Sequence, residues 1–84
     1  MMAWTIELTA SAQRDLAALD RKVALRIIDK FEVSATDPLR AFVRLKGSDE
    51  CKLRVGDGRI MAILDPRSKT VFVARIAQRS VVYR

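Results

Sequence analysis

The stretch "CKLRVGDGRIMAIL", residues 51–64, decides the fold because it joins two strand patterns through a tight turn. Before the turn, two apolar residues alternate with two basic ones, so the apolar pair faces a core and the basic pair faces away. The apolar pair is Leu53 and Val55, and the basic pair is Lys52 and Arg54. Gly-Asp-Gly then predicts a hairpin turn in which glycine supplies a positive φ. "RIMAIL" is apolar at consecutive positions, which predicts a central strand with both faces largely covered.

Three more segments outside this hairpin have strand patterns. "AWTIEL", residues 3–8, alternates apolar and polar side chains and predicts a half-buried strand. "FVRL" at 42–45 and "TVFVARIA" at 70–77 predict two others, and the second is apolar enough to be central. They connect to the hairpin through a loose "KGSDE" turn and through "DPRSK", which predicts a type I turn with Pro66.

Two helices are expected between the first strand and the rest. In "TASAQRDLAALD", residues 9–20, Thr9 or Ser11 is the expected N-cap. "RKVALRIIDKFEVSA", residues 21–35, carries an apolar stripe at helical spacing and ends before Pro38, which disfavours helical geometry at the preceding residue. The acids expected to cap these helices or to face solvent are Asp15 and Asp20.

This order predicts an α+β fold in a single domain over residues 1–84. We expect an N-terminal strand, a two-helix hairpin and then a three-stranded antiparallel meander, to which "FVRL" could add a fourth strand. All strands would form one mainly antiparallel sheet, with the helices on one face.

The charge distribution is uneven along the chain. Residues 1–37 hold five Lys and Arg against six Asp and Glu, whereas residues 38–84 hold eleven against four. A neutral first half followed by a basic second half suggests a basic face for a polyanion or an acidic protein.

Composition also excludes several kinds of site. The sequence has no His and one Cys, so His-centred catalysis and an internal disulfide are absent, and Cys51 is expected to pack as a small apolar residue. Neither Gly-rich nucleotide-binding motif occurs. The acids in the turns are scattered, so neither a metal nor another cofactor is expected. With no apolar run of membrane-spanning length and no signal-peptide core, the expected location is the cytoplasm.

Basic residues cluster around the hairpin and near the end of the chain. Lys52, Arg54 and Arg59 surround the turn, and Arg75 lies in the strand expected beside it. Arg79 and Tyr83 are four residues apart and could share a face. Arg offers bidentate donors to phosphate, and fixed donors would stabilise the charge that develops during cleavage of a phosphodiester. Three interpretations remain open from spacing alone: solvated strand charges, a docking patch for an acidic partner, or a phosphate site.

Three segments resemble toxins of the RelE/ParE superfamily. "WTIELTASAQRDLAALDRKVALRIIDKFEV" is similar to their opening strand and helical hairpin, with the pattern A-x-R-D-L-x-x-L. "RLKG…CKLRVGDGRIMAIL" is similar to their L-K-G followed by Y-[KR]-L-R-V-G-D-Y-R. "VFVARIAQRSVVYR" is similar to their V-x-V-L-x-I-x-H-R-x-x-V-Y. The likeness covers nearly the whole chain and is closest to the RelE branch.

This resemblance implies a toxin of a type II toxin–antitoxin system that cuts mRNA in the ribosomal A site without a metal. It also implies a RelB-like antitoxin that wraps the toxin, a complex that binds operator DNA through the antitoxin, and no membrane partner. The alternative is the ParE branch of the same fold, whose members poison DNA gyrase without enzymatic activity.

The resemblance also implies roles for individual residues. The catalytic positions are Lys52, Arg59, Arg79 and Tyr83, and the RNA-binding positions are Lys46, Arg54, Arg75 and Arg84. The general base could be Lys52, Tyr83 or Glu50. The chain departs from the family at four positions, because relatives often have aromatic residues at Cys51 and Gly58, glycine at Ala77 and histidine at Gln78.

Overall fold

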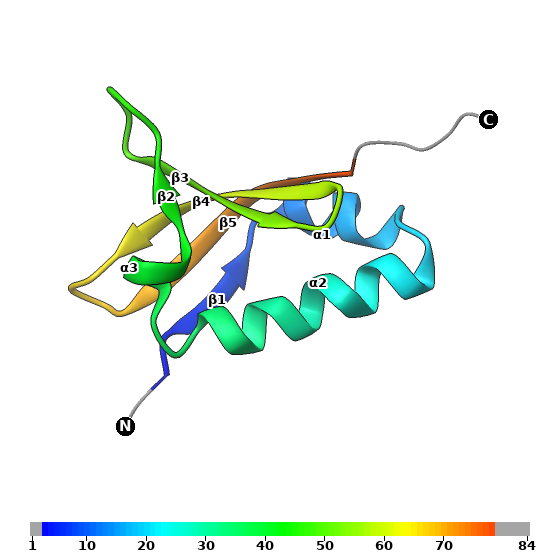
Figure 1. Ribbon diagram of the computed structural model, residues 1–84, viewed down its shortest axis with the longest axis horizontal. Coiled ribbons are helices and arrows are strands. Elements are labelled where there is room, and N and C mark those ends of the chain that lie inside the picture. The colour runs from blue at the N-terminus through cyan, green and yellow to red at the C-terminus, as the bar shows by residue number, and fades with distance from the viewer. Residues whose placement is uncertain (1–2, 79–84) are drawn as a thin grey trace.

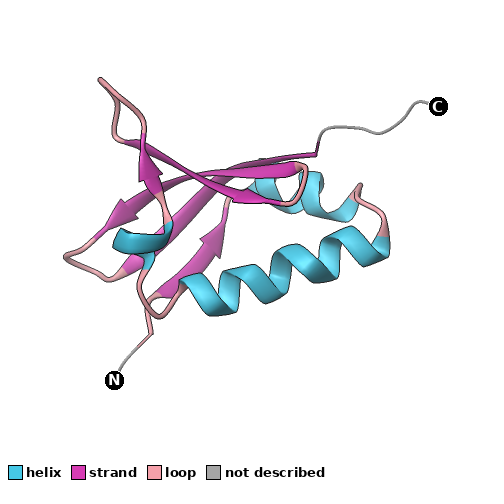
Figure 2. Cartoon of the chain, in the orientation of Figure 1, coloured by secondary structure: helices cyan, strands magenta, loops and turns pink. Residues whose placement is uncertain are grey.

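The computed structural model describes residues 3–78 and contains one five-stranded sheet with helices against one face (Figures 1 and 2). This confirms the predicted α+β fold. The elements in chain order are β1 (Thr5–Leu8), α1 (Ala10–Ala17), α2 (Arg21–Ser34), α3 (Pro38–Ala41), β2 (Val43–Arg44), β3 (Glu50–Val55), β4 (Gly58–Asp65) and β5 (Thr70–Gln78).

The sheet has the strand order β1-β5-β4-β3-β2. β3, β4 and β5 form the predicted antiparallel meander, and the short β2 adds a fourth strand to it. The last two strands, β4 and β5, are central, as predicted. β1 lies parallel to β5, with Thr5 opposite Thr70 and Leu8 opposite Val73, and the sheet is therefore mixed. Parallel neighbours need a long crossover connection, which the helices and the meander together supply here.

The helix boundaries follow local capping chemistry. The Thr9 hydroxyl accepts a hydrogen bond of 3.1 Å from the Ala12 amide, as an N-cap residue does. Asp20 occupies the N-cap position of α2, but its side chain makes no capping hydrogen bond. α3 differs from the prediction, which used Pro38 only to end the preceding helix. Pro38 is the first residue of α3. Proline is favourable at that position because the N–H that it lacks would have no partner within the helix. None of the helices within residues 3–78 is long and apolar enough to cross a membrane.

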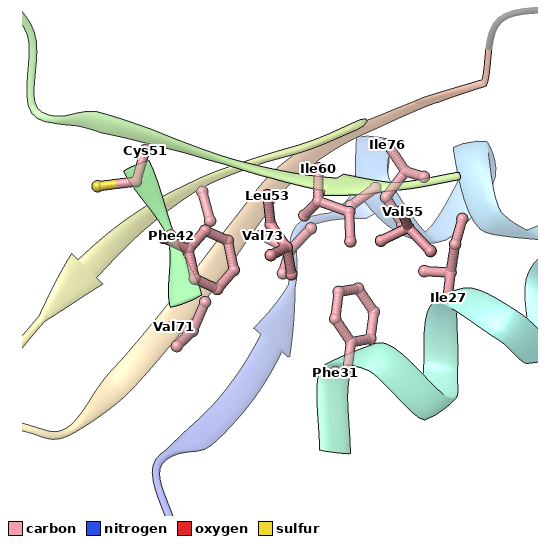
Figure 3. Packing of buried hydrophobic residues seen from close by; sticks show 12 residues of the cluster. Ile27, Phe31, Phe42, Cys51, Leu53, Val55, Ile60, Val71, Val73 and Ile76 are labelled. Carbon is pink, nitrogen blue, oxygen red and sulfur yellow. The ribbon is translucent and has the colours of Figure 1, made fainter. Parts of the chain in front are cut away.

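The core lies between α1, α2 and the sheet (Figure 3). Ile27 and Phe31 of α2 point toward the alternating apolar residues of the strands. Cys51 is part of this cluster, as predicted, and burial raises the pKa of its thiol. The sheet contributes Cys51, Leu53, Val55, Ile60, Ala62, Val71, Val73 and Ile76.

The opposite side of the sheet, here called the open face, is not covered within residues 3–78. Side chains that alternate with the core residues point to it, and they include Lys52, Arg54, Arg59, Met61, Ile63 and Phe72. The prediction that both faces of the central strands are largely covered is therefore wrong. Ile63 is 43% exposed and Phe72 is 38% exposed, because the helices pack on one face only.

We expect Ile60→Ala to lower the free energy of unfolding by about 2–5 kcal/mol, since a large apolar side chain with 0% exposure would leave a cavity. Ile63→Ala in the same strand is the matched control. The Ile63 side chain is on the open face, so its removal should lower the free energy of unfolding much less. Urea denaturation of both variants measures the difference. Equal losses would contradict the assignment of the core to one face.

Candidate active site

The hairpin between β3 and β4 places two arginines directly opposite each other. Val55 pairs with Gly58 across a two-residue loop, and Gly56 has a φ of +58°, as the predicted glycine turn requires. The pair that closes such a loop is hydrogen-bonded, so the next pair, Arg54 and Arg59, is the non-hydrogen-bonded kind in which side chains lie closer. Both arginines are exposed on the open face.

This juxtaposition of Arg54 and Arg59 is unfavourable unless an anion lies nearby. Like charges directly opposite on a sheet destabilise it. Within residues 3–78 no carboxylate lies within 4.0 Å of either guanidinium, and the ion pairs that form there are Arg44–Asp49 and Arg75–Asp15. The repulsion disappears when a phosphate accepts hydrogen bonds from both arginines, so the pair is suited to bind an anion.

Lys52 extends the cluster along β3. It is two residues before Arg54 on the open face, about 7 Å away along the strand. Its partner on β4 is Met61, and the partner of Met61 on β5 is Arg75. The structure thus brings together four of the predicted site residues on neighbouring strands, namely Lys52, Arg54, Arg59 and Arg75.

A hollow of about 600 Å³ lies beside the two opposed arginines. The hairpin forms one side of it, and Ala77 and Gln78, the last residues of β5, form the other. Its lining is Arg54, Gly56, Asp57, Gly58, Arg59, Ala77 and Gln78. The predicted residues Arg79, Tyr83 and Arg84 follow in the sequence and lie outside the described residues.

Gly58 and Gln78 share the space at the base of this hollow. They are partners across β4 and β5, and a Cβ placed on Gly58 would lie 2.7 Å from Oε1 of Gln78. Two backbone carbonyls, those of Ala77 and Val55, would lie 3.2 and 3.3 Å from the same Cβ. A side chain at position 58 would therefore require the end of the Gln78 side chain to move and the two carbonyls to shift slightly.

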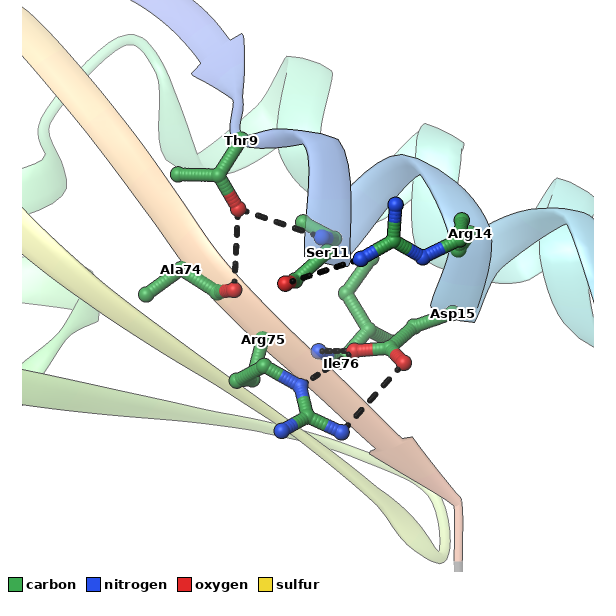
Figure 4. Close-up of polar contacts among 8 residues, drawn as sticks. Thr9, Ser11, Arg14, Asp15, Ala74, Arg75 and Ile76 are labelled. Carbon is green, nitrogen blue, oxygen red and sulfur yellow. Dashed lines mark hydrogen bonds and ion pairs between the residues drawn. The ribbon is translucent and has the colours of Figure 1, made fainter.

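Arg75 differs from the other cations because it is bound to an acid (Figure 4). Its Nε donates to Oδ2 of Asp15 over 2.8 Å, and its Nη2 donates to Oδ1 over 3.4 Å. The Ile76 amide donates to the same Oδ2 over 2.9 Å. The bonds from Arg75 and from the Ile76 amide hold the pKa of the Asp15 carboxyl below its ordinary value of 3.8. The hydrogen bond to Asp15 and its negative charge raise the pKa of Arg75.

Asp15 therefore has a role that its sequence position did not reveal. The prediction that it caps a helix or faces solvent is wrong, because its side chain joins α1 to β5 and is only 19% exposed. Asp15 and Arg75 are 60 residues apart, and no local pattern connects them. Gln78 was also missed as a lining residue, although its place at the end of a strand beside the hairpin could have indicated it.

Two other predicted residues lie away from the hollow. Lys46 is in the turn between β2 and β3, at the far end of β3 and roughly 20 Å along the strand from the Gly56 turn. Glu50, a candidate base, is opposite Ile63 and therefore lies on the open face beyond Lys52.

A model of the family described as the ParE toxin of the type II toxin–antitoxin system parDE matches residues 6–83, nearly the whole chain. The chain belongs to this toxin family. The predicted membership of the RelE/ParE superfamily is thereby confirmed. No curated protein sequence gives a significant match to this toxin.

Solved structures of both branches share the toxin's fold. The RelBE2 toxin–antitoxin complex of Mycobacterium tuberculosis is similar with a TM-score of 0.88 and 25% identity, over 93% of this chain and 100% of that one. The intact RelBE complex of E. coli has a TM-score of 0.78 at 17% identity, over 94% of this chain and 100% of that one. The chromosomal ParDE system of P. aeruginosa has a TM-score of 0.74 at 13% identity, over 93% of this chain and 98% of that one.

Proposed function

We propose that this toxin is a ribosome-dependent endoribonuclease that cleaves mRNA in the A site and so inhibits translation. The observation that carries the proposal is the opposed pair of Arg54 and Arg59. Two arginines are directly opposite each other on neighbouring strands without an ion-paired acid among the described residues, and Lys52 follows along the open face. A surface used only for solubility does not need such a pair, whereas a phosphodiester would bridge it.

RNA supplies most of the chemistry in this proposal. The 2′-oxygen attacks phosphorus, the bond from phosphorus to O5′ breaks, and the products are a 2′,3′-cyclic phosphate and a 5′-hydroxyl. One proton leaves the 2′-hydroxyl and one is taken up by O5′. The protein then needs to orient the strand, stabilise the charge on the pentacoordinate phosphorus and transfer protons. No metal takes part in these steps.

Each residue has a role in this scheme. Arg59 and Arg54 bind the scissile phosphate, because both line the hollow. Lys52, Glu50 and Tyr83 are the candidates for the general base, and Lys52 is on the open face two residues before Arg54. In line with the resemblance, Arg79 would act on the leaving group, and Lys46, Arg75 and Arg84 would contact RNA. Asp15 already binds Arg75, which leaves that residue less available to RNA than Lys52, Arg54 or Arg59.

The second candidate is inhibition of DNA gyrase through protein contact. It is favoured by the match to the ParE family model and by the similarity to a ParDE structure. A gyrase inhibitor would need a binding surface but no reacting groups, so substitutions in the arginine pair would change affinity and not a rate of cleavage.

Inducible expression followed by primer extension on a reporter mRNA separates the two candidates. New 5′ ends within codons of translated mRNA, in the reading frame, support the nuclease. If expression causes DNA damage and the mRNA stays intact, the result contradicts the nuclease and supports gyrase inhibition. Induction of Arg59→Ala serves as the control for cleavage by host enzymes.

The partner in this proposal is a cognate antitoxin, acidic and partly disordered, that wraps the toxin. Solved relatives are complexes of toxin with antitoxin, and the second half of this chain carries eleven basic residues against four acidic ones. The complex would bind operator DNA through the antitoxin.

Electrostatic attraction should govern the rate at which this antitoxin binds. We expect the association rate constant, measured by stopped flow, to fall about tenfold or more between about 0.05 M and 0.5 M salt, because opposite charges steer encounter and salt screens them. The dissociation rate should change little, since apolar contacts hold the complex. An association rate independent of salt would contradict an acidic partner.

A further inference from the structure

The edge of β5 is paired in two different ways along its length. β1 covers it as far as Val73, where Leu8 is the last partner. Beyond that point α1 takes the place of a strand (Figure 4). The Thr9 amide donates to the Val73 carbonyl over 3.0 Å, and the Thr9 hydroxyl donates to the Ala74 carbonyl over 3.0 Å. Asp15, near the end of α1, accepts the Ile76 amide, so side chains of a helix continue the pairing of the sheet.

Asp15 is connected to the hollow by the backbone of β5. Because the Ile76 amide points toward α1, the alternation of a strand directs the Ala77 amide the other way, toward β4. The residue opposite Ala77 on β4 is Arg59. Ala77 and Gln78 also line the hollow beside Arg54 and Arg59. A shift of Ile76 away from α1 would therefore move the wall of the hollow that faces the arginine pair.

We propose that Asp15 is a positioning residue for RNA cleavage: it holds the end of β5 against α1 and so sets Ala77 and Gln78 in place beside Arg54 and Arg59. The catalytic consequence rests on the proposed function, whereas the positioning of the backbone does not. Arg75 binds the same carboxylate, but the contact through which Asp15 acts is its bond to the Ile76 amide. The same ion pair neutralises Arg75 and leaves the anion site to Lys52, Arg54 and Arg59.

Three variants separate the backbone contact from the ion pair. Asp15→Ala removes both, and Asp15→Asn keeps an oxygen that can accept the Ile76 amide but loses the charge. Arg75→Ala is the matched control, because it removes the ion pair and leaves the carboxylate bonded to Ile76. Each variant is purified as the full chain and examined by amide hydrogen exchange and by mRNA cleavage on programmed ribosomes.

In Asp15→Ala we expect exchange of the Ile76, Ala77 and Gln78 amides to accelerate at least about tenfold, with the amides of Leu53 and Ile60 unchanged. The kcat for cleavage should fall about tenfold or more, because Ala77 and Gln78 are misplaced. KM should stay within about twofold of wild type, because the basic residues that bind the anion are unchanged. The exchange rates and the kcat of Asp15→Asn should lie between those of Asp15→Ala and wild type. Arg75→Ala should keep the exchange rates of these three amides and the kcat within about threefold of wild type, and because Arg75 is itself a proposed RNA contact, any loss of cleavage should appear as a higher KM.

Unchanged exchange at Ile76 in Asp15→Ala would overturn the positioning role, and so would an equal acceleration over the whole sheet. Equal losses of kcat in Asp15→Ala and Arg75→Ala would assign the effect to the ion pair and overturn the proposal as stated. A wild-type toxin that leaves mRNA intact would contradict the proposed function alone. The exchange measurement would then still decide whether Asp15 positions the end of β5.

Discussion

Replacing Arg59 by alanine is expected to lower mRNA cleavage on ribosomes about 10²–10³-fold, the usual effect of removing one donor to a developing negative charge. Arg59 is exposed on the open face and forms no ion pair with the described residues. Its removal also ends the repulsion with Arg54, so the melting temperature should equal or exceed that of wild type. Activity lost together with stability kept or gained is the signature of a residue held in place for a ligand.

Two further variants sharpen this test. Arg59→Lys should recover only part of the activity, because a single ammonium group cannot replace a bidentate guanidinium. Arg67→Ala is the matched control, since Arg67 is an exposed arginine in the turn that follows the other end of β4. Ribosome cleavage assays and thermal melts on the same preparations measure both properties. Full activity of Arg59→Ala, with normal growth arrest after induction, would contradict its assignment as the phosphate ligand.

Removing Tyr83 and Arg84 is expected to abolish cleavage, with a loss of about 10²–10⁴-fold if the phenol transfers a proton. These residues lie outside the described residues, so the expectation comes from their match to the terminal motif of the family. A deletion of two residues should change the melting temperature by only a few degrees, because the core cluster within residues 3–78 stays complete. The truncated protein should still bind its antitoxin.

The competing interpretation is that Tyr83 covers part of the core. It predicts that the truncated protein has a clearly lower melting temperature and that its loss of cleavage follows from this loss of stability. Tyr83→Phe distinguishes a proton-transfer role from stacking, since phenylalanine keeps the ring and lacks the hydroxyl. A truncated chain that melts like the parent and cleaves at the parental rate would end the claim that this segment belongs to the site.

The sequence predicted the hairpin and the cluster of Lys52, Arg54 and Arg59 around its turn because their determinants are local. A two-residue turn fixes the register, and the register alone places Arg54 opposite Arg59. The exposed side of β4 and β5 was predicted wrongly, because consecutive apolar residues do not show whether a second layer covers them. Ile63 and Phe72 remain half exposed as a result. The bond between Asp15 and Ile76 could not be predicted, since it depends on how α1 packs against a strand far along the chain.

Cleavage of mRNA on purified ribosomes tests the central claim most directly. Ribosomes programmed with a defined codon in the A site are mixed with the purified toxin, and the 5′ ends of the mRNA are mapped with and without ribosomes. We predict a cut within the A-site codon that requires the ribosome, yields a 2′,3′-cyclic phosphate and disappears with Arg59→Ala. Intact mRNA under these conditions, with inhibition of supercoiling by purified gyrase in a parallel assay, would contradict the nuclease and favour the gyrase inhibitor.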